Sequence, residues 1–405
     1  MTSQVAVSNF YGVAVASDTV SSRVTRNGTK TVTHTNKIYE LGPNHQVLVL
    51  HSGSTVTNNV PSWLLVTEWA KTLSAPLETV QDYIDSFLRW AKEAAPLHTK
   101  QSEQDYLNQR MNDHFAELSS AAAGEVDAQN EALEDKTKKV DPREVLLAKI
   151  ELNTNWLKSE PKLDGFTLEA AEQVVKNYTG DLPGKIKYWF EKLNVDKKDH
   201  ALLEKSIAHA IQSATYLVDQ DSWLAFVGFG STQSFPVNRQ VQCRSYYDGA
   251  LRVFQRESFD YAPSDKWVPG IDFFAQSASI RGFIQGYHSE TLSQIGEYVK
   301  QAMSEKLGER SSPEIANEIW DDVLGKTGQY SWDTYIQPLY NEVEGMTISR
   351  LAEFAESLVG LQATAAKTLN DGPATVGGYI EVATIDKYDG VRWVKALDTS
   401  KLSKS

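Results

Sequence analysis

Alternating apolar and polar residues at the start of the chain predict two short strands joined by a turn. Val5 and Val7, and then Val13 and Val15, are separated by small or polar residues, which is the period of a β-strand. The break at residues 8–12 is rich in turn-forming residue types. The chain is therefore expected to open with a β-hairpin.

Similar patterns continue to about residue 50. The dipeptide Asn27-Gly28 predicts a tight turn between two alternating segments, and Gly42-Pro43-Asn44 predicts a second hairpin. The spacing of apolar residues then changes at residues 62–72, where tryptophan, leucine and valine recur with the period of an amphipathic helix. These patterns predict a strand-rich first part followed by a helix.

Helical patterns dominate the middle of the chain. Residues from about 95 to 215 are predicted to form a large helical insertion. Within it, the stretch 99–142 is charged and rich in Ala, Glu and Gln, with few large apolar residues. This composition predicts an exposed helical excursion rather than part of a core.

Strand patterns return after the insertion and again at the end of the chain. Residues 222–254 alternate like strands, residues 295–368 are helical, and Asp389-Gly390 predicts the turn of a last hairpin. Strands at both ends, without a regular strand–helix–strand rhythm, predict an α+β fold. We expect one domain over residues 1–405, interrupted by the insertion.

Composition limits the classes of function. The 405 residues are 41% hydrophobic and 10% aromatic, and their formal net charge of −13 argues against nucleic acid or an anionic membrane surface as a partner. There is no apolar run long enough for a membrane span. Cys243 is the one cysteine, which excludes an internal disulfide and favours a cytoplasmic location. No metal or cofactor is expected, because the eight histidines show no ligand spacing.

The start of the chain contains residues suited to nucleophilic chemistry. Removal of Met1 would leave Thr2 with a free α-amine, so one residue would supply both a nucleophilic hydroxyl and a base. Such a device also needs a cation, a carboxylate that fixes it, and backbone N–H groups for the oxyanion. Lys37 and Asp18 are the candidates for the first two parts, and the turn that contains Gly53 is the candidate for the third. Taken alone, Asp18 would be an ordinary strand-end residue and Lys37 an exposed lysine of an edge strand.

The order of these motifs resembles a known family. Thr2, then GVAVASD, NKIYEL and VLVLHSGSTVTN, is similar to the proteasome-type threonine peptidases, which include proteasome β-subunits and the peptidase subunit of a bacterial ATP-dependent protease. The resemblance implies a four-layer αββα sandwich and hydrolysis of peptide or amide bonds. It implies catalysis by Thr2, Asp18 and Lys37, with the oxyanion amide at Leu50, where the family usually has glycine. It also implies a ring-shaped homo-oligomer, with an ATPase unfoldase as a candidate partner.

The resemblance weakens towards the end of the chain. The family's supporting Asp and Ser align with Pro373 and Val376, so that network is either absent or rebuilt from Ser231, Asp371 or Thr375. Its absence favours an alternative, a non-catalytic assembly protein of the same fold. A small-amide acylase on this fold is the other alternative.

Overall fold

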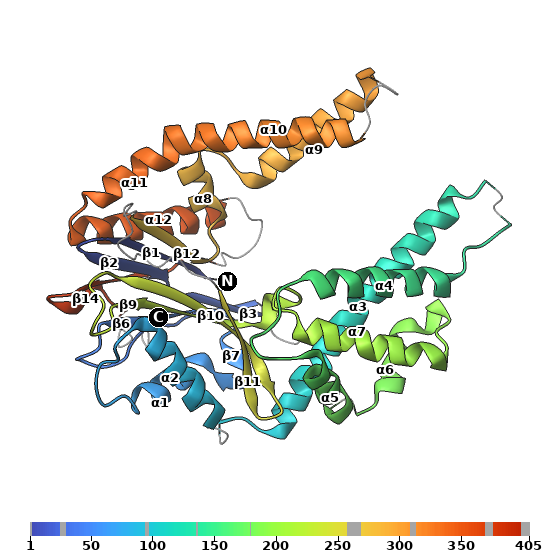
Figure 1. Cartoon of the computed structure of the whole chain (residues 1–405), viewed down its shortest axis with the longest axis horizontal. Coiled ribbons are helices and arrows are strands. Elements are labelled where there is room, and N and C mark those ends of the chain that lie inside the picture. Colours follow the sequence, from blue (N-terminus) through green and yellow to red (C-terminus); the bar gives the residue numbers. More distant parts are fainter. Residues whose placement is uncertain are drawn as a thin grey trace.

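Two five-stranded antiparallel sheets form the centre of the molecule (Figure 1). The computed structural model describes residues 2–24, 30–93, 97–134, 137–178, 180–256, 269–307, 313–368 and 376–397. Helices cover the sheets, and two further groups of helices extend from this body. The combination of helices and antiparallel sheets agrees with the predicted α+β class.

The first sheet joins the two ends of the chain. Its order is β12 (Gly270–Ala275), β1 (Ser3–Asn9), β2 (Gly12–Asp18), β13 (Ile380–Asp386) and β14 (Gly390–Lys395). The predicted first hairpin is confirmed by the pairing of Asn9 with Gly12, and the predicted last hairpin by the pairing of β13 with β14. Val5 lies opposite Ala16 and Ala6 opposite Val15, so a large residue faces a small one on both sides of the hairpin.

The second sheet contains the predicted hairpin around residues 42–44. Its order is β11 (Ala250–Arg256), β10 (Val237–Tyr247), β9 (Ser222–Gly228), β6 (Val47–Gly53) and β5 (Ile38–Glu40). Two short strand pairs lie outside the sheets: β3 (Val20–Val24) with β4 (Lys30–His34), and β7 (Val56–Thr57) with β8 (Val60–Pro61). The predicted Asn27-Gly28 turn lies outside the described residues.

Three apolar clusters hold the sheets and their helices together. The one between the sheets includes Ala6, Val13 and Val15 from the first sheet and Leu48, Leu50 and Val227 from the second. On the outer face of the first sheet, Val5, Val7, Ala14 and Ala16 pack with residues of α8 (Ala278–Gln285), α11 (Gln337–Glu344) and α12 (Ile348–Thr368). On the outer face of the second sheet pack α1 (Ser62–Ala70) and α2 (Val80–Glu93). Both faces of β1 and β2 are buried for this reason.

The segment between α2 and β9 folds around a core of its own. It contains α3 (Lys100–Ala132), α4 (Pro142–Ser159), α5 (Leu168–Tyr178), α6 (Leu182–Phe190) and α7 (His200–Gln212), with short 3₁₀ turns at Glu191–Leu193, Lys197–Asp199 and Val218–Gln220. The expectation that residues 99–142 are an exposed excursion is wrong for most of α3. Leu107, Met111, Phe115 and Leu118 form a narrow buried stripe at helical spacing, which the surrounding charged residues mask in the composition.

A second extension consists of two helices that run side by side away from the first sheet. They are α9 (Ser289–Leu307) and α10 (Pro313–Ser331), shown in orange in Figure 1. Where the two helices meet, an added Cβ at Gly296 would lie 2.5 Å from the Trp320 ring, so the glycine allows their close approach. A π-helical turn, Trp332–Ile336, joins α10 to α11. We call α9 and α10 together the arm.

Candidate active site

Thr2 is held at the start of strand β1, between β12 and β2, rather than free at the end of the chain. It directly precedes β1, is 6% exposed, and its carbonyl oxygen accepts a hydrogen bond from the Gln276 amide at 2.9 Å. Gln276 follows β12, so residue 2 is fixed against the neighbouring strand of the sheet. A terminal residue is usually poorly ordered unless the fold ties it down.

Asp18 and Lys37 form a buried ion pair beside Thr2. The register of the first hairpin sets Gln4 opposite Ser17, which brings Asp18 next to Ser3. The Asp18 Oδ1 atom accepts hydrogen bonds from the Ser3 amide at 2.9 Å and from Lys37 Nζ at 2.8 Å. The peptide that follows Thr2 and the ammonium of Lys37 therefore share one carboxylate oxygen. The structure brings together three of the four residues predicted from the sequence.

The ammonium of Lys37 is almost fully enclosed. Burial lowers its pKa, and the nearby carboxylates of Asp18 and Glu381 oppose that shift. Its Nζ atom donates to Asp18 Oδ1 and to the Val20 carbonyl oxygen at 2.7 Å. Within the described residues, these two bonds leave one of the three ammonium N–H groups for a further acceptor.

Glu381 is a second buried carboxylate at this site that the sequence analysis did not identify. It lies opposite Ser17 in β13, and its Oε2 atom accepts a hydrogen bond from the Lys37 amide at 3.4 Å. Burial raises the pKa of Glu381. A sequence signal existed: along β13, Glu381 shares the parity of Ala383 and Ile385, which lie in the apolar layer between the sheets. A glutamate at a core position of a strand indicates a special role.

Leu50 does not belong to this group. It lies inside β6, where it pairs with Ile38 of β5 on one side and Ala225 of β9 on the other, and its side chain packs between the sheets. The next amide, that of His51, donates to the Lys37 carbonyl on the β5 side. Because amides alternate sides along a strand, the Leu50 N–H points towards β9. This placement argues against the predicted oxyanion role of Leu50, since a neighbouring strand occupies that side.

The same alternation of amides along β6 identifies the Gly53 amide as a better oxyanion candidate than the Leu50 amide. Its N–H points to the same side as that of His51, but β5 begins at Ile38 and no longer runs beside residue 53. Gly53 has φ of +77°, and an added Cβ would lie 2.3 Å from the Asp221 carbonyl oxygen. Glycine is therefore required at this point of the turn. The sequence showed the Ser-Gly-Ser-Thr turn but not which amide was free of the ladder.

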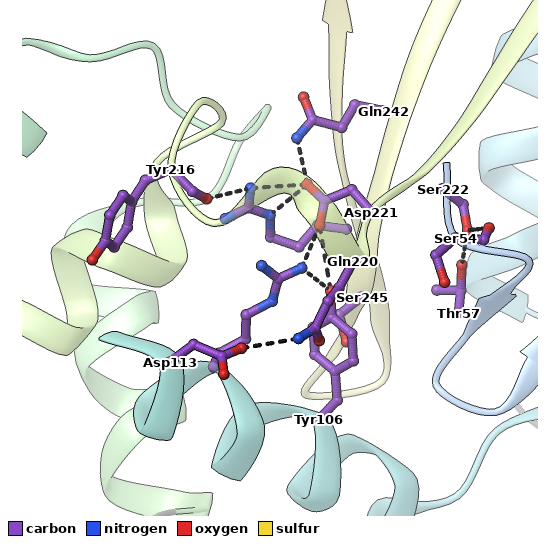
Figure 2. Close-up of polar contacts among 12 residues, drawn as sticks. Ser54, Thr57, Tyr106, Asp113, Tyr216, Gln220, Asp221, Ser222, Gln242 and Ser245 are labelled. Atoms are coloured by element: carbon purple, nitrogen blue, oxygen red, sulfur yellow. Dashed lines mark hydrogen bonds and ion pairs between the residues drawn. The ribbon is translucent and has the colours of Figure 1, made fainter. Parts of the chain in front are cut away.

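Hydrogen bonds hold this turn against the end of the helical insertion (Figure 2). The Ser54 carbonyl oxygen accepts from Ser222 Oγ at 2.7 Å and lies 2.8 Å from His51 Nε2, while the Ser54 amide donates to the Asp221 carbonyl oxygen at 2.9 Å. Burial lowers the pKa of His51 to about 4, so this histidine is neutral near pH 7.

The side chain of Asp221 in turn binds two buried arginines. Its Oδ1 atom accepts from Arg110 of α3 at 2.6 Å, and its Oδ2 atom accepts from Arg244 of β10 at 2.8 Å. Gln242 and Tyr106 also donate to this carboxylate, and Figure 2 shows both side chains directed at it. One residue thus connects the insertion, the second sheet and the turn that contains Gly53.

The positions that align with the family's supporting Asp and Ser, and the residues suggested to replace them, do not supply side-chain partners to Asp18 among the described residues. Pro373, Asp371 and Thr375 lie outside the described residues. Val376 is buried and apolar, and the next amide, of Gly377, donates to Asp18 Oδ2 at 3.0 Å. Ser231 is not near this site, because its amide donates to the carbonyl oxygen of Leu77, three residues before α2, and its carbonyl oxygen accepts from Lys387. A backbone amide therefore supports Asp18 where the family was expected to use side chains.

Comparison with known proteins does not identify a family. Neither the protein-family models nor the curated proteins contain a match to this sequence. Among the described residues, the helices are too short or too polar to span a lipid bilayer.

Proposed function

We propose that this chain is an amide hydrolase of the N-terminal-nucleophile type, with Thr2 as the nucleophile and peptides as the first substrates to test. The observation that carries this proposal is the buried Lys37–Asp18 pair bonded to the peptide next to Thr2. A buried ion pair is costly to desolvate and contributes little net stability. Its position beside a fixed terminal threonine is explained if it serves catalysis.

Each group has a role in this reaction. After removal of Met1, Thr2 Oγ1 attacks the substrate carbonyl carbon while the Thr2 α-amine accepts the hydroxyl proton. The Gly53 N–H stabilises the negative charge that develops on the carbonyl oxygen. That intermediate collapses, the substrate amine leaves with a proton, and an ester remains on Thr2. Attack by water then releases the acid and restores the hydroxyl group.

Lys37 and Asp18 lower the barrier without forming a bond to substrate. A protonated Lys37 next to Thr2 favours the partly ionised hydroxyl electrostatically, and its third N–H has no acceptor among the described residues. Asp18 fixes the ammonium and, through the Ser3 amide, the backbone that follows the nucleophile. The low polarity around a 3% exposed lysine strengthens this effect.

The arrangement of layers also supports the proposal. Two sheets face each other across an apolar layer, and helices cover both outer faces. This order corresponds to the four-layer αββα sandwich that the resemblance implies. A homo-oligomeric ring, an ATPase unfoldase as partner and a cytoplasmic location follow only from the sequence, and each stays a prediction.

One observation favours the non-catalytic alternative. Val376 is buried and apolar at a position where the family has a supporting serine. Hydrolysis of a fluorogenic peptide library by the full chain distinguishes the two. We expect activity in the wild type, strongly reduced activity in Thr2→Ser, which keeps a hydroxyl and an amine, and none in Thr2→Ala. Equal activity of Thr2→Ala and wild type would refute the assignment of the nucleophile, and complete inactivity of the wild type would favour the assembly protein.

A further inference from the structure

The arm carries a broad apolar face that the rest of the chain leaves exposed. The residues of this face are between 39% and 62% exposed: Ile295, Tyr298, Ile319, Val323 and Tyr330. Large apolar residues gathered on one surface usually mark a binding site, whereas scattered ones need no explanation.

Helical geometry places these residues on the same side of the arm. Counting about 100° per residue, Ile319, Val323 and Tyr330 lie on one flank of the line along which Trp320 and Ala316 face α9. On α9, Ile295 lies on the corresponding flank, about 100° from Gly296, and Tyr298 lies at the outer margin of that flank, about 160° from Gly296. Since α9 and α10 are antiparallel, these two flanks form one continuous surface, which we call the arm face.

On the same count, Lys306 and Lys326 are the charged residues that fall within this surface. The acidic residues of both helices fall outside the arm face. Glu305 and Asp322 lie at its border, and Asp322 pairs with Lys326 at 2.6 Å. The net negative charge of the chain therefore does not oppose the approach of a second arm face to the first.

We propose that the arm face binds the same face of a second copy of this chain, and that the two arms form an antiparallel four-helix bundle. Each helix of the arm has 19 residues and so is about 28 Å long. Two helices packed about 10 Å apart give a face about 20 Å wide. The resulting footprint of about 560 Å² per copy reaches the ~500 Å² per partner that a specific interface needs.

A two-fold contact of this kind is self-complementary, because each residue of one copy meets a residue of the same surface on the other. Apolar side chains of two helices from each copy would interdigitate as in other four-helix bundles. This inference does not depend on the proposed hydrolase activity. Where other contacts also build a larger assembly, the arm contact would double it.

Sedimentation of the full chain measures the predicted contact. The wild type should have at least twice the 45.2 kDa mass of one chain. Ile319→Glu should reduce the measured mass two-fold and weaken the association about 100-fold or more, because it buries an unpaired carboxylate. Asn317→Glu is the matched control, since Asn317 is exposed on the opposite side of α10. It adds the same charge and should leave the mass unchanged.

Mixing and cross-linking experiments test whether a second copy of the chain binds the arm face. Ile319→Cys should cross-link to a second copy with a bifunctional thiol reagent, and Asn317→Cys should not; the native Cys243 is buried. Tagged Ile319→Glu should capture less untagged wild type than tagged Asn317→Glu does, since a two-fold contact is damaged from either side. A monomeric wild type at about 100 µM, well above typical dissociation constants of stable dimers, would overturn the proposal. So would an equal loss of mass in both glutamate variants, or equal capture of wild type by both of them, which would indicate a different surface.

Discussion

Replacing Asp221 by Asn should destabilise the fold far more than replacing Arg110 by Met, although the two residues share an ion pair. Among the described residues, Asp221 is the carboxylate that forms ion pairs with both guanidinium groups, and all three side chains are at most 2% exposed. The two changes have different consequences because they remove charges of opposite sign from this buried group of one carboxylate and two guanidinium groups.

The magnitudes follow from what each change leaves behind. Asp221→Asn removes the carboxylate that Arg110 and Arg244 both bind. Arg110 then keeps its electrostatic interaction with Asp113, whereas Arg244 loses its ion-pair partner, and an uncompensated buried charge costs about 3–5 kcal/mol. Arg110→Met leaves Arg244 and Asp221 as a neutral pair and removes a hydrogen bond to a charged group, worth about 1.5–3 kcal/mol. The lower part of that range is expected, since Arg110→Met also removes the free-energy cost of taking the Arg110 guanidinium out of water.

Urea unfolding followed by tryptophan fluorescence and circular dichroism gives both values. The two probes must coincide before a single free energy of unfolding is used. We expect the midpoint of Asp221→Asn to fall clearly below that of Arg110→Met, with unchanged slopes. If Asp221→Asn lowers the free energy of unfolding by less than about 1 kcal/mol, or if the two variants lower it equally, the unpaired buried charge does not determine the loss of stability.

Three further predictions concern titratable groups. Lys37→Ala should reduce kcat/KM nearly as much as Thr2→Ala, because groups that act as a unit give non-additive losses; Lys37→Arg should fail too, and wild-type rates in either would contradict the role of the ammonium. Burial lowers the pKa of Lys37, so activity should be lost as pH rises through a value below the usual 10.4 or so. Glu381→Gln should move that limb to still lower pH, because Glu381 opposes the shift, and an unmoved limb would exclude this coupling. His51 and His114 have pKa values lowered by burial to about 4 and about 3, so the unfolded chain takes up protons first as pH falls below about 6.5. Each should then cost about 2 kcal/mol of stability between pH 7 and pH 5, and equal urea midpoints at the two values would contradict this.

The parts of the fold that follow from local pattern were predictable. The period of two in β1 and β2 and the turn residues between them specify the first hairpin, and its register alone sets Asp18 beside Ser3. The proximity of Lys37 to Asp18 was expected from the family resemblance and not from any local pattern. It needs β5 to lie in the other sheet, directly across from the end of β2.

Two kinds of feature were not predictable from the sequence: the side of a strand to which an amide points, and contacts between residues far apart along the chain. The family resemblance implies an oxyanion amide at Leu50, and the sequence alone does not decide between Leu50 and the Gly53 turn, because it does not show which side of a strand an amide faces. The stripe from Leu107 to Leu118 was missed because two or three residues, most of them charged or polar, separate its apolar ones. The bond between Arg110 and Asp221 joins residues 111 positions apart, and no local pattern reports such a contact.

The proposed function requires that Thr2 becomes the terminal residue and forms the acyl-enzyme. This is tested most directly by treating the purified full chain with a β-lactone, an acylating reagent, and locating the adduct by mass spectrometry of the N-terminal peptide. We expect a chain that begins at Thr2, one acyl group on that residue, and no adduct in Lys37→Ala. Retention of Met1 with no adduct on Thr2, or an acyl group on another residue instead, would contradict it.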